Sequence, residues 1–240
     1  MDARDLEMEF RRFSDRQTFY GQWYPQQDEV LYRNYFYDKR DGFFIECGAC
    51  DGLVDTCCLF FEKRGWRGIN IEPSDVAYER LVVNRPNCLN LQIGLGDKDS
   101  SMKFTKAVKN GYGGGCIKWN KVFKQEVINE GFTFEETEIE VLTYRTLMPK
   151  YDVVNVDLFV LDTDGYELQV LEGMIGSVSL PKVFCIEYSL LKDDSLEKLK
   201  KLLGQMGYRF DFISYNNAFF AMPEVPEREW WGVTPNMVYN

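Results

Sequence analysis

Acidic residues end four short apolar segments of this chain: Glu46, Glu72, Asp162 and Glu187. The carboxyl ends of parallel strands meet at one edge of a sheet, which is where α/β proteins bind their ligands, so these carboxylates are expected to lie together. Grouped carboxylates can act as general bases, accept hydrogen bonds from hydroxyl groups or hold a divalent cation. They are hard to explain as core residues, because an unpaired buried charge is costly.

The chain contains no histidine. This absence excludes a His-based catalytic triad, a His-ligated zinc ion and an imidazole proton shuttle. Any general base must therefore be Asp, Glu, Lys, Tyr or Cys.

The segment Phe43–Gly52, FFIECGACDG, is a short apolar run that ends in an acid and breaks into glycines. Gly48 and Gly52 allow the backbone to turn sharply and a ligand to approach it closely, although their spacing is GxxxG and not the GxGxxG of a dinucleotide fold. Twenty residues beyond Gly52, Glu72 can accept both hydroxyls of a ribose. Together they favour a nucleotide-type cofactor, the alternative for Glu72 being an exposed acid beside a helix N-terminus.

A second acidic segment, DTDGYE, runs from Asp162 to Glu167 and carries three carboxylates in six residues. Such groups repel one another unless a cation, a hydrogen-bond donor or solvent compensates them. Helix capping can account for one of the three. A functional role is therefore expected, first for Asp162 and less strongly for Asp164 and Glu167.

The cysteines offer a competing interpretation, because Cys47 and Cys50 form a C-x-x-C pair with Cys57-Cys58 nearby. The second pair lacks the C-x-x-C spacing of a zinc or redox site, and adjacent residues on a helix point in different directions. The seven cysteines are an odd number, and several lie in apolar runs. We expect free thiols that pack as small hydrophobic residues.

The elements that would position these residues alternate between strand and helix. This alternation predicts an α/β fold with a doubly wound, mostly parallel sheet and one antiparallel strand added by a closing hairpin with its turn at Asn216-Asn217. The predicted strands are 42–46, 68–72, 88–93, 158–161, 183–186, 208–213 and 218–222. The predicted helices are 56–64 with Asp55 as its cap, 75–84 with Ser74 as its cap, one after Gly165 with Leu168, Leu171, Ile175 and Val178 on one face, and one that starts at Asp194.

One domain at residues 39–222 is expected between an N-terminal arm at 1–38, which includes a helix from about Asp28 to Tyr37, and an aromatic C-terminal segment at 223–240 with Trp230-Trp231. The alternation lapses at 98–150, where Ser101–Ala107 and Ile139–Tyr144 read as possible strands and Asn110–Cys116 as a flexible loop. We expect this insertion to cover a substrate, with a purely structural insertion as the alternative.

The net charge of −10 argues against general binding to nucleic-acid phosphates. No segment has the length and apolarity of a membrane span, and the N-terminus does not read as a signal peptide, so a cytoplasmic protein is expected. The oligomeric state stays open.

Three ordered segments, FFIECGACDG, GWRGINIEPSDVAYERL and LFVLDTDGYELQVLEGM, together resemble the FkbM family of S-adenosylmethionine-dependent methyltransferases, over about Gln27 to Glu187. The resemblance implies the class I methyltransferase fold, a seven-stranded sheet with a reversed final hairpin. It also implies that Glu72 binds the cofactor's ribose and that Asp97 lies near its adenine. The remaining residues that it implies for cofactor binding are Glu46, Cys47, Gly48, Ala49, Asp51, Gly52, Pro73 and Asp162. Glu46-Cys47 and Asp164 depart from the family pattern, which usually has Asp with a small apolar residue, and Glu.

The expected function is transfer of the methyl group of S-adenosylmethionine to a hydroxyl of a small-molecule or glycan acceptor, such as a sugar, a polyketide or a related metabolite. Asp162 is the first candidate for the base, ahead of Glu187 and Glu167. A divalent metal held by Asp162, Asp164 and Glu187 is the alternative. Two other functions stay open: a non-catalytic binding or scaffold protein that retains the fold, and a nicotinamide-dependent oxidoreductase, which the missing third glycine disfavours.

Overall fold

Seven strands form the main sheet of the protein, in the order β10-β11-β9-β8-β1-β2-β3. The computed structural model describes residues 19–109, 112–117, 121–188, 194–227 and 231. All neighbouring strands are parallel except β11, which is antiparallel to both β9 and β10. The strands are β1 (Phe43–Cys47), β2 (Arg67–Ile71), β3 (Leu89–Leu91), β8 (Leu158–Leu161), β9 (Val183–Glu187), β10 (Arg209–Ser214) and β11 (Asn217–Ala221). This order, with its reversed final hairpin, confirms the predicted class I methyltransferase fold.

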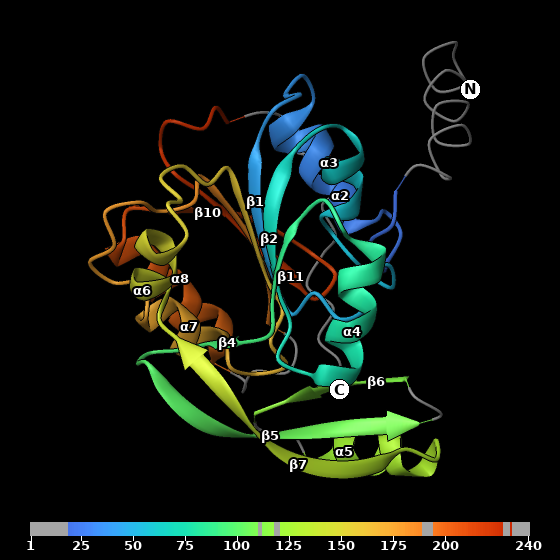
Figure 1. Cartoon of the computed structure of the whole chain (residues 1–240). Helices are drawn as coiled ribbons and strands as arrows, with labels where there is room; N and C mark the ends of the chain where they lie inside the picture. The colour runs from blue at the N-terminus through green and yellow to red at the C-terminus, as the bar shows by residue number, and fades with distance from the viewer. Residues whose placement is uncertain (1–18, 110–111, 118–120, 189–193, 228–230, 232–240) are drawn as a thin grey trace.

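Helices cover both faces of this sheet (Figure 1). Because β1 and β8 are central, nearly all of their side chains are buried, and all but Glu46 are apolar, as a doubly covered parallel sheet requires. One face packs against α6 (Tyr144–Lys150), α7 (Glu167–Glu172) and α8 (Ser195–Gln205). The other packs against α2 (Gln27–Leu31), the π-helix η1 (Tyr32–Phe36) and α3 (Leu59–Lys63), with α4 (Asp75–Asn84) on the same side.

A second sheet of four strands lies beyond the carboxyl ends of the main sheet, at the bottom of Figure 1. Its order is β4-β7-β5-β6, and α5 (Lys121–Asn129) precedes β7 in the chain. The strands are β4 (Gly94–Leu95), β5 (Ser100–Lys109), β6 (Tyr112–Cys116) and β7 (Thr133–Leu142). The insertion at 98–150 is thus mostly regular structure.

The prediction of a flexible loop at Asn110–Cys116 is wrong for residues 112–116, because these residues form strand β6 and pair with β5. Residues 110 and 111 lie outside the described residues. Glycine removes the side-chain alternation by which a strand is recognised, although it leaves the backbone donors and acceptors in place. Gly115 lies so close to Phe104 that an added Cβ would be 2.6 Å from the ring. The predicted strand at Ile139–Tyr144 belongs to the longer β7, and Tyr144 instead begins α6.

Two predicted helices are shorter than expected. The helix predicted at 56–64 is only α3, and Asp55 does not cap it: the Thr56 hydroxyl accepts the backbone N–H of Leu59 at 3.3 Å. The helix after Gly165 ends at Glu172, so the placement of Ile175 and Val178 on its buried face is wrong. Val178 is fully exposed.

The N-terminal helix predicted from Asp28 to Tyr37 corresponds to α2 and η1. On η1, the side-chain amide of Asn34 makes two hydrogen bonds to the backbone of Trp231, each at 2.8 Å. Its Nδ2 donates to the carbonyl of Trp231, and its Oδ1 accepts the backbone N–H of Trp231. Residues 1–18, Trp230 and 232–240 lie outside the described residues, and the domain boundaries at 38 and 222 stay predictions.

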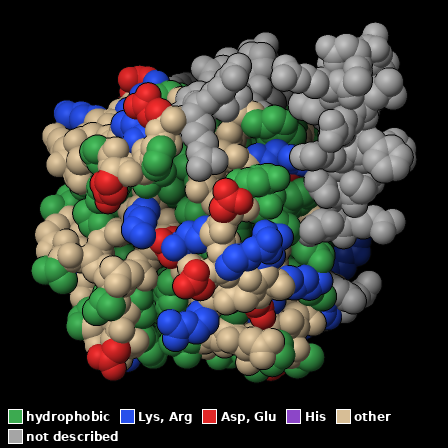
Figure 2. Space-filling view, turned by 90° about the horizontal axis from the view of Figure 1, so that it is seen from above, with side chains coloured by type: hydrophobic (Ala, Val, Ile, Leu, Met, Phe, Trp, Pro, Cys, Tyr) green, Lys and Arg blue, Asp and Glu red, His purple; other side chains and the backbone are tan. Residues whose placement is uncertain are grey.

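Seen from above, the end of the molecule away from the second sheet carries Lys and Arg side chains interspersed with Asp and Glu (Figure 2). Among the described residues, we find no helix with the length and apolarity needed to span a bilayer.

Candidate functional site

A cavity of about 220 Å³ lies between the carboxyl ends of the central strands and the second sheet. The loops after β1, β2 and β8 form one wall, and residues of β4, β5, β6 and β7 form the opposite wall. The lining residues are Gly48, Ala49, Cys50, Val54, Asp55, Thr56, Glu72, Pro73, Asp162, Thr163, Asp164 and Tyr166 on the first side, and Gly94, Leu95, Phe104, Gly115, Cys116, Ile117 and Ile139 on the second. The insertion therefore helps to enclose the predicted site.

The loop after β1 begins at Gly48, where only glycine is compatible with the backbone. Its φ is +91°, and a Cβ built there would lie 1.7 Å from the carbonyl oxygen of Asp162. The amides of Gly48 and Ala49 both bond the carbonyl of Ile71, at 3.0 and 3.1 Å. The missing side chain thus lets β1, β2 and β8 converge at the cavity.

Glu72 joins the loops after β1 and β2. Its Oε2 accepts the backbone N–H of Cys50 at 2.9 Å, and its Oε1 accepts that of Ser74 at 2.8 Å. Burial raises the pKa of Glu72 to about 7, against the effect of these two hydrogen bonds. A carboxylate oxygen can accept more than one hydrogen bond, so a carboxylate held in this way can still accept ligand hydroxyls.

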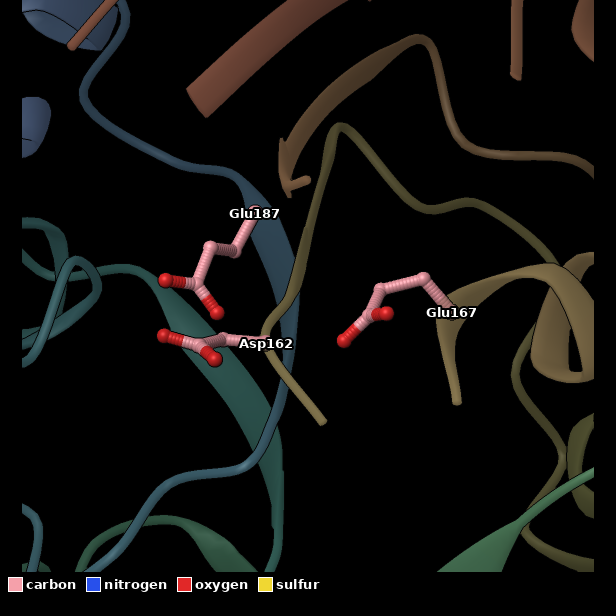
Figure 3. Close-up of side chains that lie close together, drawn as sticks. All are labelled: Asp162, Glu167 and Glu187. Carbon is pink, nitrogen blue, oxygen red and sulfur yellow. The ribbon is translucent and has the colours of Figure 1, made fainter. Parts of the chain in front are cut away.

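Three carboxyl groups meet beside the cavity: oxygens of Asp162, Glu167 and Glu187 lie within 4.8 Å of one another (Figure 3). The Asp162 side chain is exposed, yet protein atoms crowd its carboxyl group. That loss of solvent, followed by the charges of Glu187 and Asp164, raises the pKa of Asp162 well above its usual range. Burial and the charges of Glu187 and Glu167 likewise raise the pKa of Asp164 to about 7. The acid cluster therefore holds a proton strongly. A positive charge in the cavity would favour the ionised form of the cluster and so favour release of that proton.

Glu167, the first residue of α7, shapes the turn that carries Asp162 and Asp164. Its Oε1 accepts the backbone N–H groups of Thr163 and Gly165, at 2.8 and 3.1 Å, and the Thr163 hydroxyl at 2.9 Å. Its Oε2 is buried, with no hydrogen-bond partner among the described residues. The three acids that lie close enough to share an ion are Asp162, Glu167 and Glu187. The predicted metal set of Asp162, Asp164 and Glu187 named Asp164 where the structure has Glu167.

Glu46 does not line the cavity; it forms a buried network with Arg85. Its Oε1 accepts the backbone N–H groups of Cys57 and Cys58, at 2.7 and 3.1 Å, and its Oε2 lies 3.3 Å from Nη1 of Arg85. Arg85 is fully buried and also pairs with Glu62. This network holds the chain between β1 and α3. Sequence reasoning missed Arg85, because an arginine before a proline at a helix end gives no signal of burial.

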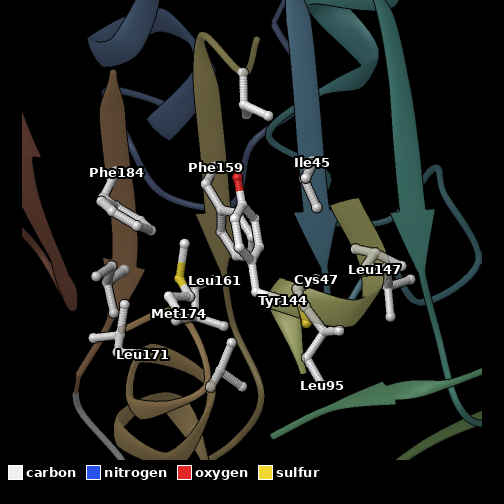
Figure 4. Packing of buried hydrophobic residues seen from close by; sticks show 14 of the residues in the cluster. Ile45, Cys47, Leu95, Tyr144, Leu147, Phe159, Leu161, Leu171, Met174 and Phe184 are labelled. Atoms are coloured by element: carbon white, nitrogen blue, oxygen red, sulfur yellow. The ribbon is translucent and has the colours of Figure 1, made fainter. Parts of the chain in front are cut away.

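Other predicted cofactor residues have structural contacts. Cys47 packs in the core beside Leu95 and Leu161, and burial raises the pKa of its thiol above the usual range (Figure 4). Asp51 accepts the backbone N–H groups of Leu53 and Val54, each at 2.9 Å, and Gly52 leaves room for the Arg85 side chain. Asp97 is exposed and does not line the cavity. All seven cysteines are free thiols.

Lys106 of β5 fastens the second sheet to the main domain. Its ammonium group lies 2.9 Å from Oδ1 of Asp75, in the first turn of α4, and 3.4 Å from Oε2 of Glu135 on β7. Lys106 is only 7% exposed. Nothing in the sequence distinguished it from a surface lysine, because its partners lie about thirty residues away in either direction.

The structure therefore brings together six predicted residues at the cavity: Gly48, Ala49, Glu72, Pro73, Asp162 and Asp164. Glu167 and Glu187 join them through Asp162. The cavity residues that sequence reasoning missed come mainly from the second sheet, whose distant strand pairings a local pattern does not reveal.

A search of curated proteins gave no match. The structure is similar to a fibrillarin pre-rRNA processing protein of Methanococcus jannaschii, at 13% identity over 76% of this chain and 66% of that chain, with a TM-score of 0.42. It is also similar to a TehB-like SAM-dependent methyltransferase of Corynebacterium glutamicum, at 8% identity over 82% and 86% of the two chains, with a TM-score of 0.43. A SAM-dependent methyltransferase of Aquifex aeolicus is 12% identical over 86% and 89%, with a TM-score of 0.41.

The sequence model of the methyltransferase FkbM domain matches residues 46–210, which contain the glycine loop, Glu72, the acid cluster and the second sheet. This match extends over more than half of the chain. The protein belongs to the FkbM family of methyltransferases.

Proposed function

We propose that the protein is an S-adenosylmethionine-dependent O-methyltransferase whose acceptor is a hydroxyl group of a small molecule or glycan, such as a sugar, a polyketide or a related metabolite. The family supports methyl transfer and use of this cofactor. The observation that carries the choice of a hydroxyl is the carboxyl group of Asp162 at the cavity, with that of Glu187 close behind it, because a hydroxyl acceptor must lose a proton.

The residues at the cavity fit the cofactor. Glu72 offers a carboxylate to the ribose hydroxyls, and Gly48 and Ala49 allow a ligand to approach the backbone. Leu95, Phe104 and Ile139 offer an apolar wall to the adenine, and the acid cluster matches the positive charge of the sulfonium group. When bound, S-adenosylmethionine supplies a methyl group on a good leaving group, so that positioning of the acceptor does much of the work.

Asp162 is the proposed base. It is exposed at the cavity, and its raised pKa gives it a stronger affinity for a proton than an ordinary aspartate has. The positive charge of the bound cofactor would favour loss of the proton that the acid cluster holds, and the ionised carboxylate of Asp162 would then take the proton of the acceptor oxygen. Glu167 acts differently, since three hydrogen bonds to the turn occupy one of its oxygens. We assign it the positioning of Asp162 and Asp164.

The test combines calorimetric titration of S-adenosylmethionine and S-adenosylhomocysteine with transfer of a labelled methyl group to a panel of hydroxyl-bearing acceptors. Asp162→Asn should bind S-adenosylhomocysteine within a few-fold of the wild type and lose transfer by about 100-fold or more. Asp152→Asn is the matched control: Asp152 is exposed away from the cavity, and asparagine tolerates its positive φ. It should transfer as the wild type does.

Full turnover by Asp162→Asn would show that the proposed base is wrong. Binding of the cofactor without transfer to any acceptor would favour the scaffold alternative, and binding of NAD in its place would favour the oxidoreductase. Transfer that is lost with EDTA and restored by Mg²⁺ would favour the metal over the carboxylate base.

A further inference from the structure

The turn between β10 and β11 places one side chain directly on the acid cluster. Nδ2 of Asn216 donates a hydrogen bond to Oε1 of Glu187 at 2.6 Å, and both residues are buried. Nδ2 of Asn217 donates to Oδ1 of Asn216 at 2.8 Å, which orients the Asn216 amide with its donor toward Glu187. The backbone contributes as well, because the N–H of Tyr188 bonds the carbonyl of Asn216 at 2.9 Å.

The same turn is held from its other side by the N-terminal segment. The ring of Tyr215 stacks on that of Trp23, with centroids 5.4 Å apart and planes at 11°. The Tyr215 hydroxyl donates to the carbonyl of Tyr24. Tyr215 has a φ of +53°, which side-chain-bearing residues rarely adopt, so these contacts maintain a backbone conformation that is unfavourable by itself. That conformation places the Asn216 side chain within hydrogen-bond distance of Glu187.

Glu187 needs such support because of its position. Its carboxylate faces that of Asp162 (Figure 3), and the two charges repel each other when both groups are ionised, as they must be before Asp162 takes a proton. A buried donor offsets part of that repulsion and restricts the carboxylate to one orientation. Hydrogen bonds to charged groups are stronger than those between neutral groups, so the Asn216 contact has the strength for this role.

We propose that Asn216 is a positioning residue for methyl transfer, which holds the carboxylate of Glu187 against Asp162. The inference rests on the proposed function and adds to it a residue from a different element, the hairpin turn. Asn216 acts through Glu187 and does not take the proton itself. Its effect should therefore depend on the presence of the Glu187 carboxylate.

A double-mutant cycle tests this dependence. Asn216→Ala should lower kcat about 10- to 100-fold, while the affinity for S-adenosylhomocysteine and the KM for the acceptor stay within a few-fold of the wild type. In a Glu187→Gln background the same change should lower kcat less than about 2-fold, because the carboxylate on which it acts is gone. Asn216→Leu keeps the approximate size of asparagine but removes the donor, and it should lower kcat at least as much as Asn216→Ala.

Asn34→Ala is the control, since Asn34 is a buried asparagine on η1 whose bonds go to Val30 and Trp231. It should lower the melting temperature and leave kcat unchanged in both backgrounds. Additive losses for Asn216→Ala and Glu187→Gln, or wild-type kcat in Asn216→Leu, overturn the inference and leave the proposed function standing. A wild-type chain that transfers no methyl group to any hydroxyl acceptor overturns both.

Discussion

Replacing Gly48 with alanine adds one methyl group at the point where β1 and β8 converge. The new Cβ would lie 1.7 Å from the carbonyl oxygen of Asp162, which is backbone and has no rotamer into which to move. Gly48 also has a φ of +91°, where a side chain is strained even in open space. The substitution therefore forces apart two strand ends that carry the cofactor loop and the proposed base.

The two effects can be separated with Gly207, which lies between α8 and β10. Its φ is +94°, nearly the same as that of Gly48, and an added Cβ would meet nothing within 4 Å. Gly207→Ala should therefore show the backbone strain alone, about 1–2 kcal/mol, or roughly 5 °C in the melting temperature of a chain of this size. Gly48→Ala adds the cost of overpacking, for a total of about 3–5 kcal/mol and a loss of about 10–15 °C.

Thermal unfolding of the two variants and the wild type measures this difference. Calorimetric titration of S-adenosylhomocysteine is the second assay: Gly48→Ala should bind it at least about tenfold more weakly, because the loop moves, and Gly207→Ala should bind it as the wild type does. Equal loss of melting temperature in the two variants, or unchanged affinity in Gly48→Ala, would refute the assignment of the β1–β8 contact as the constraint on Gly48.

Two further predictions concern Glu72 and Arg85. Because the pKa of Glu72 is about 7 and ribose hydroxyls donate to its ionised form, binding should release a proton, and affinity should rise about tenfold between about pH 6 and pH 8. Calorimetry with 5′-methylthioadenosine, which has the ribose without a titrating amino acid, measures this affinity as a function of pH. In Glu72→Gln the affinity should no longer depend on pH over this range. A wild-type affinity that does not change with pH contradicts the prediction. Arg85→Met leaves the buried Glu46 carboxylate without its cation and should lower the free energy of unfolding in denaturant by about 3–5 kcal/mol. A loss below about 1 kcal/mol would show that the pair contributes little.

The sequence predicted the parts of the fold that depend on local pattern. Short apolar runs that end in acids marked β1, β2, β8 and β9, and the asparagines at 216 and 217 marked the closing hairpin. Alternation of strands with helices then requires a parallel sheet, whose carboxyl ends bring Glu72, Asp162 and Glu187 to one side of the molecule.

What the sequence did not predict depends on partners far apart in the chain. The glycines of β6 read as a loop because their strand character comes from pairing with β5. Glu46 read as a ligand residue like the other strand-end acids, since nothing marked Arg85 as its buried partner. The spacing of Val178 predicted a place on the buried face of the helix after Gly165, yet that helix ends at Glu172. The next residue, Gly173, packs against the carbonyl of Gly96. A side chain at Gly173 would lie 2.0 Å from that oxygen, a contact that no local pattern encodes.

The central position of β1 and β8 in the sheet also bears on the order of folding. These neighbours are separated by residues 48–157, which include the whole second sheet. During synthesis the strand that carries Gly48 therefore emerges long before the strand that completes its site, and closing so long a segment slows folding. Until β8 has been made, the inner edge of β1 has no partner. The topology therefore leaves that edge exposed to wrong pairing for as long as residues 48–157 are being made.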